Sequence, residues 1–173
     1  MRVRAALAVP AASAAAAALL LTAPQSQAAT GRAATPHCAE KALTVKAKAV
    51  AGRTTVVRFN VTNHGSRACL VDRVPTVTFG NLDGAALPKP AGGTGGYRLA
   101  AGATAHADVR TIADPADREA RRTGSLTVAA SSAHAGRTFT AARLGTGKRV
   151  LVWEPVTTWW QRSAAAADRA IGL

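Results

Sequence analysis

The sequence contains few aromatic residues and few cysteines. Phe, Trp and Tyr together make up 4% of its 173 residues, and only two residues are cysteine. These low numbers exclude an aromatic-rich binding protein and a mini-protein held together by many disulfides. Hydrophobic residues nonetheless make up 48% of the chain, most of them Ala, Val and Leu. That apolar share is ordinary for a globular protein, and the length predicts one domain.

The sequence also lacks the common motifs of catalytic and metal sites. It has no G-x-S-x-G, no H-E-x-x-H and no glycine-rich loop that cradles phosphate. Its four histidines have no metal-ligand spacing, and its nine acidic residues offer no pair suited to glycoside hydrolysis. His106 and Asp108 share a strand face, and we interpret them as a solvated surface pair. The sequence therefore supports neither an enzyme nor a metal or cofactor site.

The N-terminal residues have the three parts of a secretory signal peptide. Arg2 and Arg4 precede an apolar run, and a short polar stretch then leads to Ala28. We expect residues 1–28 to be the signal peptide, with cleavage after Ala28, and residues 29–36 to be a flexible leader. An uncleaved membrane anchor is the alternative, although the run is short and weakly hydrophobic for a span. The mature protein is then secreted, and extracellular or associated with the cell wall.

Cys38 and Cys69 both fall in the part of the chain expected to be exported. Two thiols in an oxidising compartment most simply form one disulfide. A metal-binding pair or a catalytic thiol are the alternatives, but neither cysteine has suitable partner residues nearby in the sequence.

Basic residues outnumber acidic ones by 22 to 9, for a net charge of +13. Removing residues 1–28 takes away two arginines and no acid, so the mature chain keeps a charge of +11. Such a field attracts anionic polymers: wall teichoic acids, phospholipid headgroups or extracellular nucleic acid. The two basic doublets, Arg121-Arg122 and Lys148-Arg149, have no interleaved aromatic residues, so sequence-specific recognition of nucleic acid is not supported. The alternative is a compositional bias toward Arg and Ala, with the charge serving solubility.

Short alternating segments separated by turn residues fill the chain from about residue 43. Residues 43–49 alternate with lysines outward, and Thr54–Asn63 repeats the pattern more strongly. Further strands are expected over these segments: 68–71, 74–79, 85–87, 97–99, 105–110, 126–130, 138–144 and 149–156. Pro75 marks a strand start or an edge. Turns are expected at 63–66 and 83–84, and a short helical turn within the charged segment 114–124, which Pro115 and Gly124 bound closely.

This spacing predicts an all-β, antiparallel β-sandwich of about eight or nine strands over residues 37–157. The tail, 158–173, is expected to be a short helix or irregular, with Ser163 as a helix cap. Residues 88–96 contain four glycines and two prolines, so we expect a mobile linker there.

Six residues are candidates for a ligand or partner surface. The three tryptophans all lie within the last 21 positions, and exposed coplanar rings can bind sugars or partners. The alternative is packing, with the first in the core and the other two pinning the tail. Three basic residues project from the first two strands. The six are Trp153, Trp159, Trp160, Lys46, Lys48 and Arg58.

These features predict a monomeric, non-enzymatic binding or structural module at the cell envelope. Its partner would be an anionic wall polymer or membrane surface, or another envelope protein. A secreted hydrolase, or a hydrolase inhibitor using residues 88–96 as an exposed loop, is the alternative.

Several short motifs follow one another in a set order over residues 36–157. They are Cys38 before a Leu-x-Val strand, Asn63 in a reversal before Cys69, Pro75 six positions after that cysteine, Asp83-Gly84, Leu99-Ala100-Ala101-Gly102 leading into Ala105, and Val152-x-x-Pro155-Val156. In this order and spacing the chain resembles domain-of-unknown-function family 4232, which is found in secreted and lipid-anchored proteins of actinobacteria.

The resemblance implies an extracytoplasmic immunoglobulin-like sandwich with a disulfide between Cys38 and Cys69. It implies no established activity. The family often has a second cysteine pair in its C-terminal half, which this chain lacks, and often a glycine at the position of Arg73.

Overall fold

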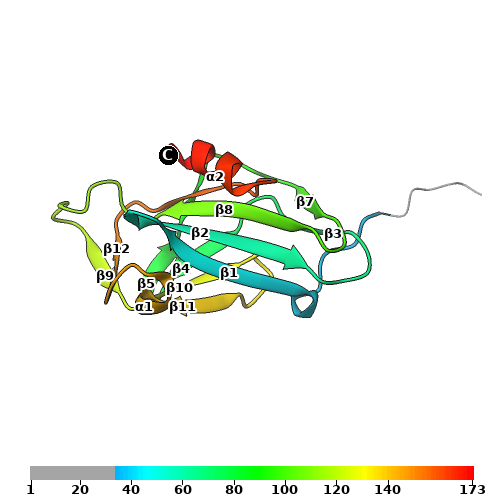
Figure 1. Ribbon diagram of the computed structural model, residues 1–173, viewed down its shortest axis with the longest axis horizontal. Helices are drawn as coiled ribbons and strands as arrows, with labels where there is room; N and C mark the ends of the chain where they lie inside the picture. Colours follow the sequence, from blue (N-terminus) through cyan, green and yellow to red (C-terminus); the bar gives the residue numbers. More distant parts are fainter. Residues whose placement is uncertain (1–33) are drawn as a thin grey trace, which may run out of the picture. The chain divides into compact units, whose positions relative to one another are not determined.

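The computed structural model describes residues 34–173, which form a β-sandwich (Figure 1). The all-β fold, the single disulfide and the short C-terminal helix are confirmed. The expected signal peptide and most of the expected leader lie outside the described residues.

One layer of the sandwich is a five-stranded sheet. Its order is β1 (Leu43–Val50), β2 (Arg53–Asn63), β8 (Thr104–Arg110), β13 (Val156–Thr158) and β6 (Leu87–Lys89). Neighbouring strands are antiparallel, except that β6 runs parallel to β13. The two strands with the clearest alternation in the sequence, β1 and β2, therefore form one side of this sheet, with β1 at its edge.

The second layer is a four-stranded sheet flanked by two strand pairs. The sheet order is β11 (Arg137–Thr140), β10 (Ser125–Ala129), β4 (Thr76–Phe79) and β5 (Leu82–Ala85). The pairs are β12 (Val150–Val152) with β9 (Arg121–Thr123), and β3 (Cys69–Asp72) with β7 (Gly96–Leu99). Several of the strands in the described chain have only three or four residues, which explains why they outnumber the eight or nine expected.

The core lies between the layers and is aliphatic, with few aromatic rings. Val57, Phe59 and Val61 of β2 are fully buried, as the alternation predicts. Phe59 meets Trp160 edge to face, with ring centroids 5.7 Å apart. Each such side chain contributes about 1.5–3 kcal/mol by leaving water. The small set of aromatic residues is thus used partly for packing.

Two turns differ from the sequence prediction or refine it. Asn63 ends β2, and its side-chain oxygen accepts a hydrogen bond from the backbone N–H of Gly65 at 2.8 Å, as expected for a turn there. A turn is expected at Asp83-Gly84, but the chain turns earlier, between Phe79 and Leu82, which pair directly with each other. Asp83 and Gly84 belong to β5. Gly80, with φ 52°, supplies the left-handed conformation that this tighter turn needs.

The expected strands over 138–144 and 149–156 are each divided. Thr140 ends β11 and caps a short helix, α1 (Ala141–Leu144), by accepting a hydrogen bond from the Arg143 backbone. The later segment breaks between β12 and β13 at Glu154, whose φ is 45°. The charged segment 114–124 makes turns and then β9. Period-two alternation alone does not reveal these breaks, because the apolar residues continue through them.

The C-terminal tail forms part of the sandwich. Thr158 lies in β13 and Trp160 lies in the core, although the sequence places both beyond the domain boundary. Helix α2 (Ala164–Ile171) follows, capped by Ser163, whose side chain accepts from the Ala166 N–H at 3.2 Å. The cap is confirmed. An isolated helix of this length is marginal in water. Burial of Ala167 and Ile171 against the sheet stabilises this one.

The disulfide ties the first described residues to the second layer. Cys38 and Cys69 are bonded, and both are nearly buried. Backbone hydrogen bonds of 2.8 Å join Cys38 N–H to Leu70 C=O, and Leu70 N–H to Pro36 C=O. The bridge therefore holds the chain before β1 against β3.

Replacing Cys38 and Cys69 together by serine should lower the free energy of unfolding by about 3–4 kcal/mol, the loop-closure entropy of this separation. Urea denaturation followed by tryptophan fluorescence measures it. Reduction of the unmodified protein should give the same loss, and an unchanged midpoint in both cases would contradict the assignment.

Candidate functional site

The outer face of the five-stranded sheet carries polar side chains in rows that cross the strands. One row runs from Lys48 on β1 to Arg58 on β2 and Asp108 on β8. Because neighbouring strands lie about 4.8 Å apart, residues of one row are direct neighbours. The row begins at an exposed lysine and ends beneath α2, where Asp108 is fully buried.

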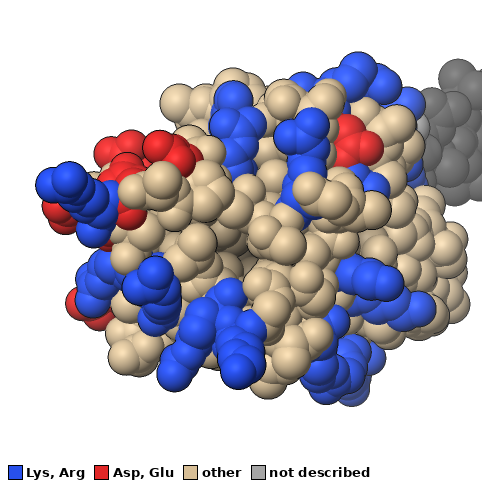
Figure 2. Space-filling view, turned by 60° about the vertical axis from the view of Figure 1, so that its left-hand side comes forward, with Lys and Arg blue, Asp and Glu red and all other residues tan. Residues whose placement is uncertain are grey.

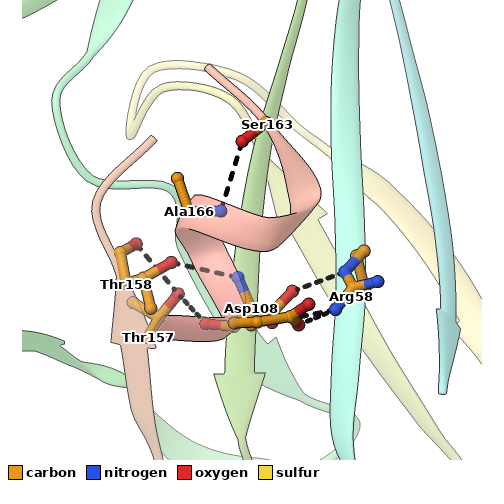
Figure 3. A network of polar contacts seen from close by, with 7 residues as sticks. Arg58, Asp108, Thr157, Thr158, Ser163 and Ala166 are labelled. Atoms are coloured by element: carbon orange, nitrogen blue, oxygen red, sulfur yellow. Dashed lines mark hydrogen bonds and ion pairs between the residues drawn. The ribbon is translucent and has the colours of Figure 1, made fainter. Parts of the chain in front are cut away.

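Arg58 forms the centre of this row (Figure 3). Its Nε donates to Asp108 Oδ1 at 3.1 Å and its Nη2 donates to Asp108 Oδ2 at 3.4 Å. Nη2 also donates to Asp168 of α2. Both ion pairs found in residues 34–173 therefore involve the same guanidinium group. The two carboxylates balance the charge of Arg58 and fix α2 to the sheet.

Two buried threonines of β13 hold the Asp108 backbone. The Asp108 N–H donates to Thr158 Oγ1 at 3.0 Å, and Thr157 Oγ1 donates to the Asp108 carbonyl at 3.4 Å (Figure 3). The interpretation of His106 and Asp108 as a solvated surface pair is therefore wrong for Asp108. The sequence pattern puts this residue on the outer face correctly, but α2 covers it there.

Burial shifts the pKa of both groups. Burial raises the pKa of Asp108 above its ordinary value, and Arg58 offsets part of that rise. Burial also lowers the pKa of His106, and the nearby charge of Arg58 lowers it further. The Asp108 carboxylate accepts hydrogen bonds from Arg58 and not from the imidazole, and His106 Nδ1 has no hydrogen-bond partner in the described chain. The Asp108 side chain is thus joined to β2 through Arg58.

A different group of basic residues lies at the β1 edge. Lys46 lines one cavity of about 240 Å³ together with Arg137 of β11 and Arg143 of α1, and it shares a neighbouring cavity of about 440 Å³ with Lys48. All four side chains are exposed. No Asp or Glu is among the described residues that line either cavity. We call Lys46, Lys48, Arg137 and Arg143 the basic surface.

Figure 2 shows the charge distribution on one face of the molecule. Lys and Arg side chains are spread over most of that face, whereas Asp and Glu gather mainly at its left-hand end. Positive residues therefore lie across most of this face, and at its left-hand end they adjoin the acidic ones.

The three tryptophans do not form one platform. Trp160 is 3% exposed and belongs to the core, whereas Trp153 and Trp159 are half-buried in different cavities. The guanidinium carbon of Arg73 lies 5.2 Å from the Trp159 ring centroid, a cation–π contact. Of the two interpretations, Trp160 follows the packing one, and Trp159 combines packing with a place in a pocket. The packing interpretation is wrong for Trp153, which is half-buried beside a cavity and is not one of the core residues.

That pocket joins residues far apart in the sequence. It has a volume of about 350 Å³, and we call it the aromatic–arginine pocket. It lies between Arg73, Tyr97 of β7 and the segment that leads into α2. Its polar and aromatic lining consists of Arg73, Tyr97, Trp159, Trp160, Gln161 and Arg162.

Residues 88–96 are more ordered than a linker. Pro88 lies within β6, which pairs with β13, and Gly96 begins β7. Between them, the Pro90 carbonyl accepts a hydrogen bond from Trp159 Nε1 at 3.1 Å. At Gly93, a side-chain Cβ would come within 3.0 Å of the Trp159 ring. The expected linker is thus shortened and anchored on a tryptophan.

Several residues of these sites have no signal in the sequence. Arg137 and Arg143 join Lys46 only because β11 and α1 lie beside β1. Arg73 and Tyr97 join Trp159 only through the pairing of β3 with β7 and the return of the C-terminal segment. A sequence pattern places a residue on a face of its own strand, but not beside a distant strand.

Among the described residues, no three His, Cys, Asp or Glu side chains are close enough to hold a metal ion. Within residues 34–173, no helix has the length and apolarity to cross a membrane.

Replacing Arg58 with Met should destabilise the protein by about 3 kcal/mol near neutral pH, because it leaves a buried carboxylate without its counter-charge. The loss should shrink as the pH falls to about 5. Without Arg58, the pKa of Asp108 in the folded state lies still further above its value in the unfolded state. The folded state therefore takes up a proton on acidification and gains stability relative to the unfolded state. Urea denaturation at the two pH values measures this. His106 changes in the same direction, since Arg58 no longer disfavours its charge.

The matched control is Arg58→Met combined with Asp108→Asn, which removes the buried charge. This double variant should be more stable near neutral pH than Arg58→Met alone. A loss that is equal at both pH values, in the single and the double variant, would contradict a buried ionised Asp108.

Comparison with known proteins identifies a family without a described activity. Residues 38–160 match the family described as Domain of unknown function (DUF4232). No curated protein and no solved structure gives a significant match to the chain. The match spans both cysteines, the polar row of the outer face and the three tryptophans. The chain therefore belongs to the DUF4232 family.

Proposed function

We propose that this protein is a secreted, non-enzymatic binding module of the cell envelope that holds anionic polymers on its basic surface. One observation carries the proposal: exposed cations from β1, β11 and α1 meet around adjoining cavities with no carboxylate in the described lining. The field there attracts polyanions, and anionic groups can contact several cations at once.

The use of the acidic residues supports this surface. In the described chain, Asp108 and Asp168 both pair with Arg58. Glu40 and Asp72 accept hydrogen bonds from the backbone N–H groups of Gly136 and Ser132. These acids make contacts within the fold. Glu40 lines a cavity together with Arg137, but no carboxylate is found in the described lining around Lys46, Lys48 and Arg143.

The disulfide and the N-terminal residues support the location. A disulfide indicates an oxidising environment. Residues 1–28 carry the three parts of an export signal. In such a location, the anionic polymers of a cell wall are the nearest abundant ligands for a basic surface. Lipid headgroups are the second source of the same charge.

Lys46, Lys48 and Arg143 should be replaced together by Gln, and retention on isolated cell wall measured against salt. Each cation close to an anionic surface contributes about 1 kcal/mol. The triple variant should therefore bind at least about tenfold more weakly at low salt, with a shallower salt dependence.

The control is Arg67→Gln, Lys89→Gln and Arg98→Gln, three exposed residues outside both cavities. It removes the same net charge and should bind within about twofold of the unmodified protein. Equal weakening in both variants would mean that net charge alone is responsible. Retention that raised salt leaves unchanged would contradict electrostatic binding altogether. Vesicles with anionic headgroups, tested in parallel, separate a membrane from a wall polymer.

A further inference from the structure

The aromatic–arginine pocket has walls fixed by backbone hydrogen bonds between distant segments. Trp160 N–H donates to the Arg73 carbonyl at 3.1 Å, and Arg73 N–H donates to the Gly95 carbonyl at 3.0 Å. Gln161 and His106 exchange two backbone hydrogen bonds, at 2.7 and 2.9 Å. The pocket is therefore preformed, which reduces the entropic cost of binding a ligand.

Its lining favours an anion beside a flat or ring-shaped group. Arg73 and Arg162 supply two permanent positive charges, and Tyr97 and Gln161 supply neutral hydrogen-bonding groups. No acidic residue is found among the described lining residues. Arginine matches the geometry of phosphate through parallel N–H donors, so a phosphate is better suited to this pocket than a simple halide.

Trp159 acts mainly by positioning Arg73. Arg73 stacks on its ring, Pro90 accepts from its indole N–H, and Gly93 lies against it. These contacts occupy much of the tryptophan surface, and they hold the guanidinium group at the pocket. Tyr97, which is half-buried, remains as the aromatic group available to a ligand.

The volume sets the size of the ligand. At about 350 Å³ the pocket is larger than a bare phosphate needs, and it falls at the lower end of small-molecule sites. One sugar ring with an attached phosphate fills such a space. An aromatic wall beside charged donors is suited to a unit with one apolar ring face and one anionic group.

We propose that the aromatic–arginine pocket binds a single phosphate-bearing sugar unit, with Arg73 and Arg162 on the phosphate and Tyr97 beside the ring. This proposal rests on the proposed function in one respect: the sugar unit would come from the anionic envelope polymer. The pocket itself is a separate site from the basic surface.

The two sites lie on one row of the sheet. Lys46, Asn60 and His106 are opposite one another on β1, β2 and β8, and His106 pairs with Gln161 at the pocket. Three strand spacings separate Lys46 from Gln161, which is about 15 Å. A polymer whose terminal unit enters the pocket could thus reach the basic surface within a few repeat units.

Titration with glucose 1-phosphate, followed by the side-chain N–H resonances of the three tryptophans in nuclear magnetic resonance spectra, tests the proposal. The Trp159 resonance should shift and saturate with a dissociation constant of about 1 mM, as expected for so small a ligand. The Trp153 resonance, from a different cavity, should stay in place. Glucose and inorganic phosphate are titrated separately, to isolate the ring and the charge.

The variant Arg162→Gln alters an exposed residue with no side-chain hydrogen bond in the described chain, so it should fold normally. Alone it should weaken binding of glucose 1-phosphate at least about fivefold, and with Arg73→Gln about fiftyfold or more. Neutralising Lys46, Lys48 and Arg143 should change this binding less than twofold. The Arg162→Gln variant should in turn change retention on cell wall at low salt less than twofold. The two measurements therefore show separately whether the pocket proposal or the basic-surface proposal fails.

Three results would overturn the inference. One is the absence of a saturable Trp159 shift up to about 20 mM ligand, well above the expected dissociation constant. Another is equal affinity for inorganic phosphate and glucose 1-phosphate, which would mean an anion site with no place for a sugar. The third is equal affinity for glucose, which would mean that the arginines do not contribute.

Discussion

The arrangement of this protein depends on the burial of one carboxylate. Asp108 lies on the outer face of the sheet, where the alternation of β8 directs it, and a charged group on that face would ordinarily meet water. Helix α2 covers Asp108 and excludes solvent from it. Arg58 supplies the compensating charge and also binds Asp168 of that helix. The same contacts therefore fix the C-terminal segment, complete β13 beside β8 and bring Trp160 into the core.

The outer face is divided in two as a result. Where α2 lies, Asp108 is buried and both it and Asp168 are paired with the partly exposed Arg58. Beyond Arg58, toward the edge at β1, lysines have no carboxylate beside them among the described residues. On the other side, the residues that lead into α2 form one wall of the aromatic–arginine pocket. A single helix thus separates a site based on charge alone from one based on charge, shape and an aromatic ring.

Much of the fold could be predicted from the sequence, because its strongest signals are local. The alternation of Val57, Phe59 and Val61, the turn at Asn63 and the cap at Ser163 each depend on neighbours within a few residues. The candidate sites depend on contacts between distant segments, which no local pattern records. The sequence predicts that Lys46 is an outward-facing cation, but it does not predict that Lys46 lies beside Arg143. The alternation of β8 predicts correctly which face of the sheet Asp108 lies on, but the prediction that it is exposed to solvent is wrong. A short alanine-rich segment gives little sign that it will cover a strand.

The position of β1 at the edge of the sheet has a consequence for how copies of the chain meet. An edge strand of eight residues presents unpaired backbone groups that could pair with the same strand of a second copy. Lys46 and Lys48 on that strand would repel their equivalents in such a pair, which disfavours this pairing. A polyanion laid along β1 would neutralise this repulsion and gather several copies along its length. The lysines would therefore keep the protein dispersed in solution and allow crowding only where the polymer is present.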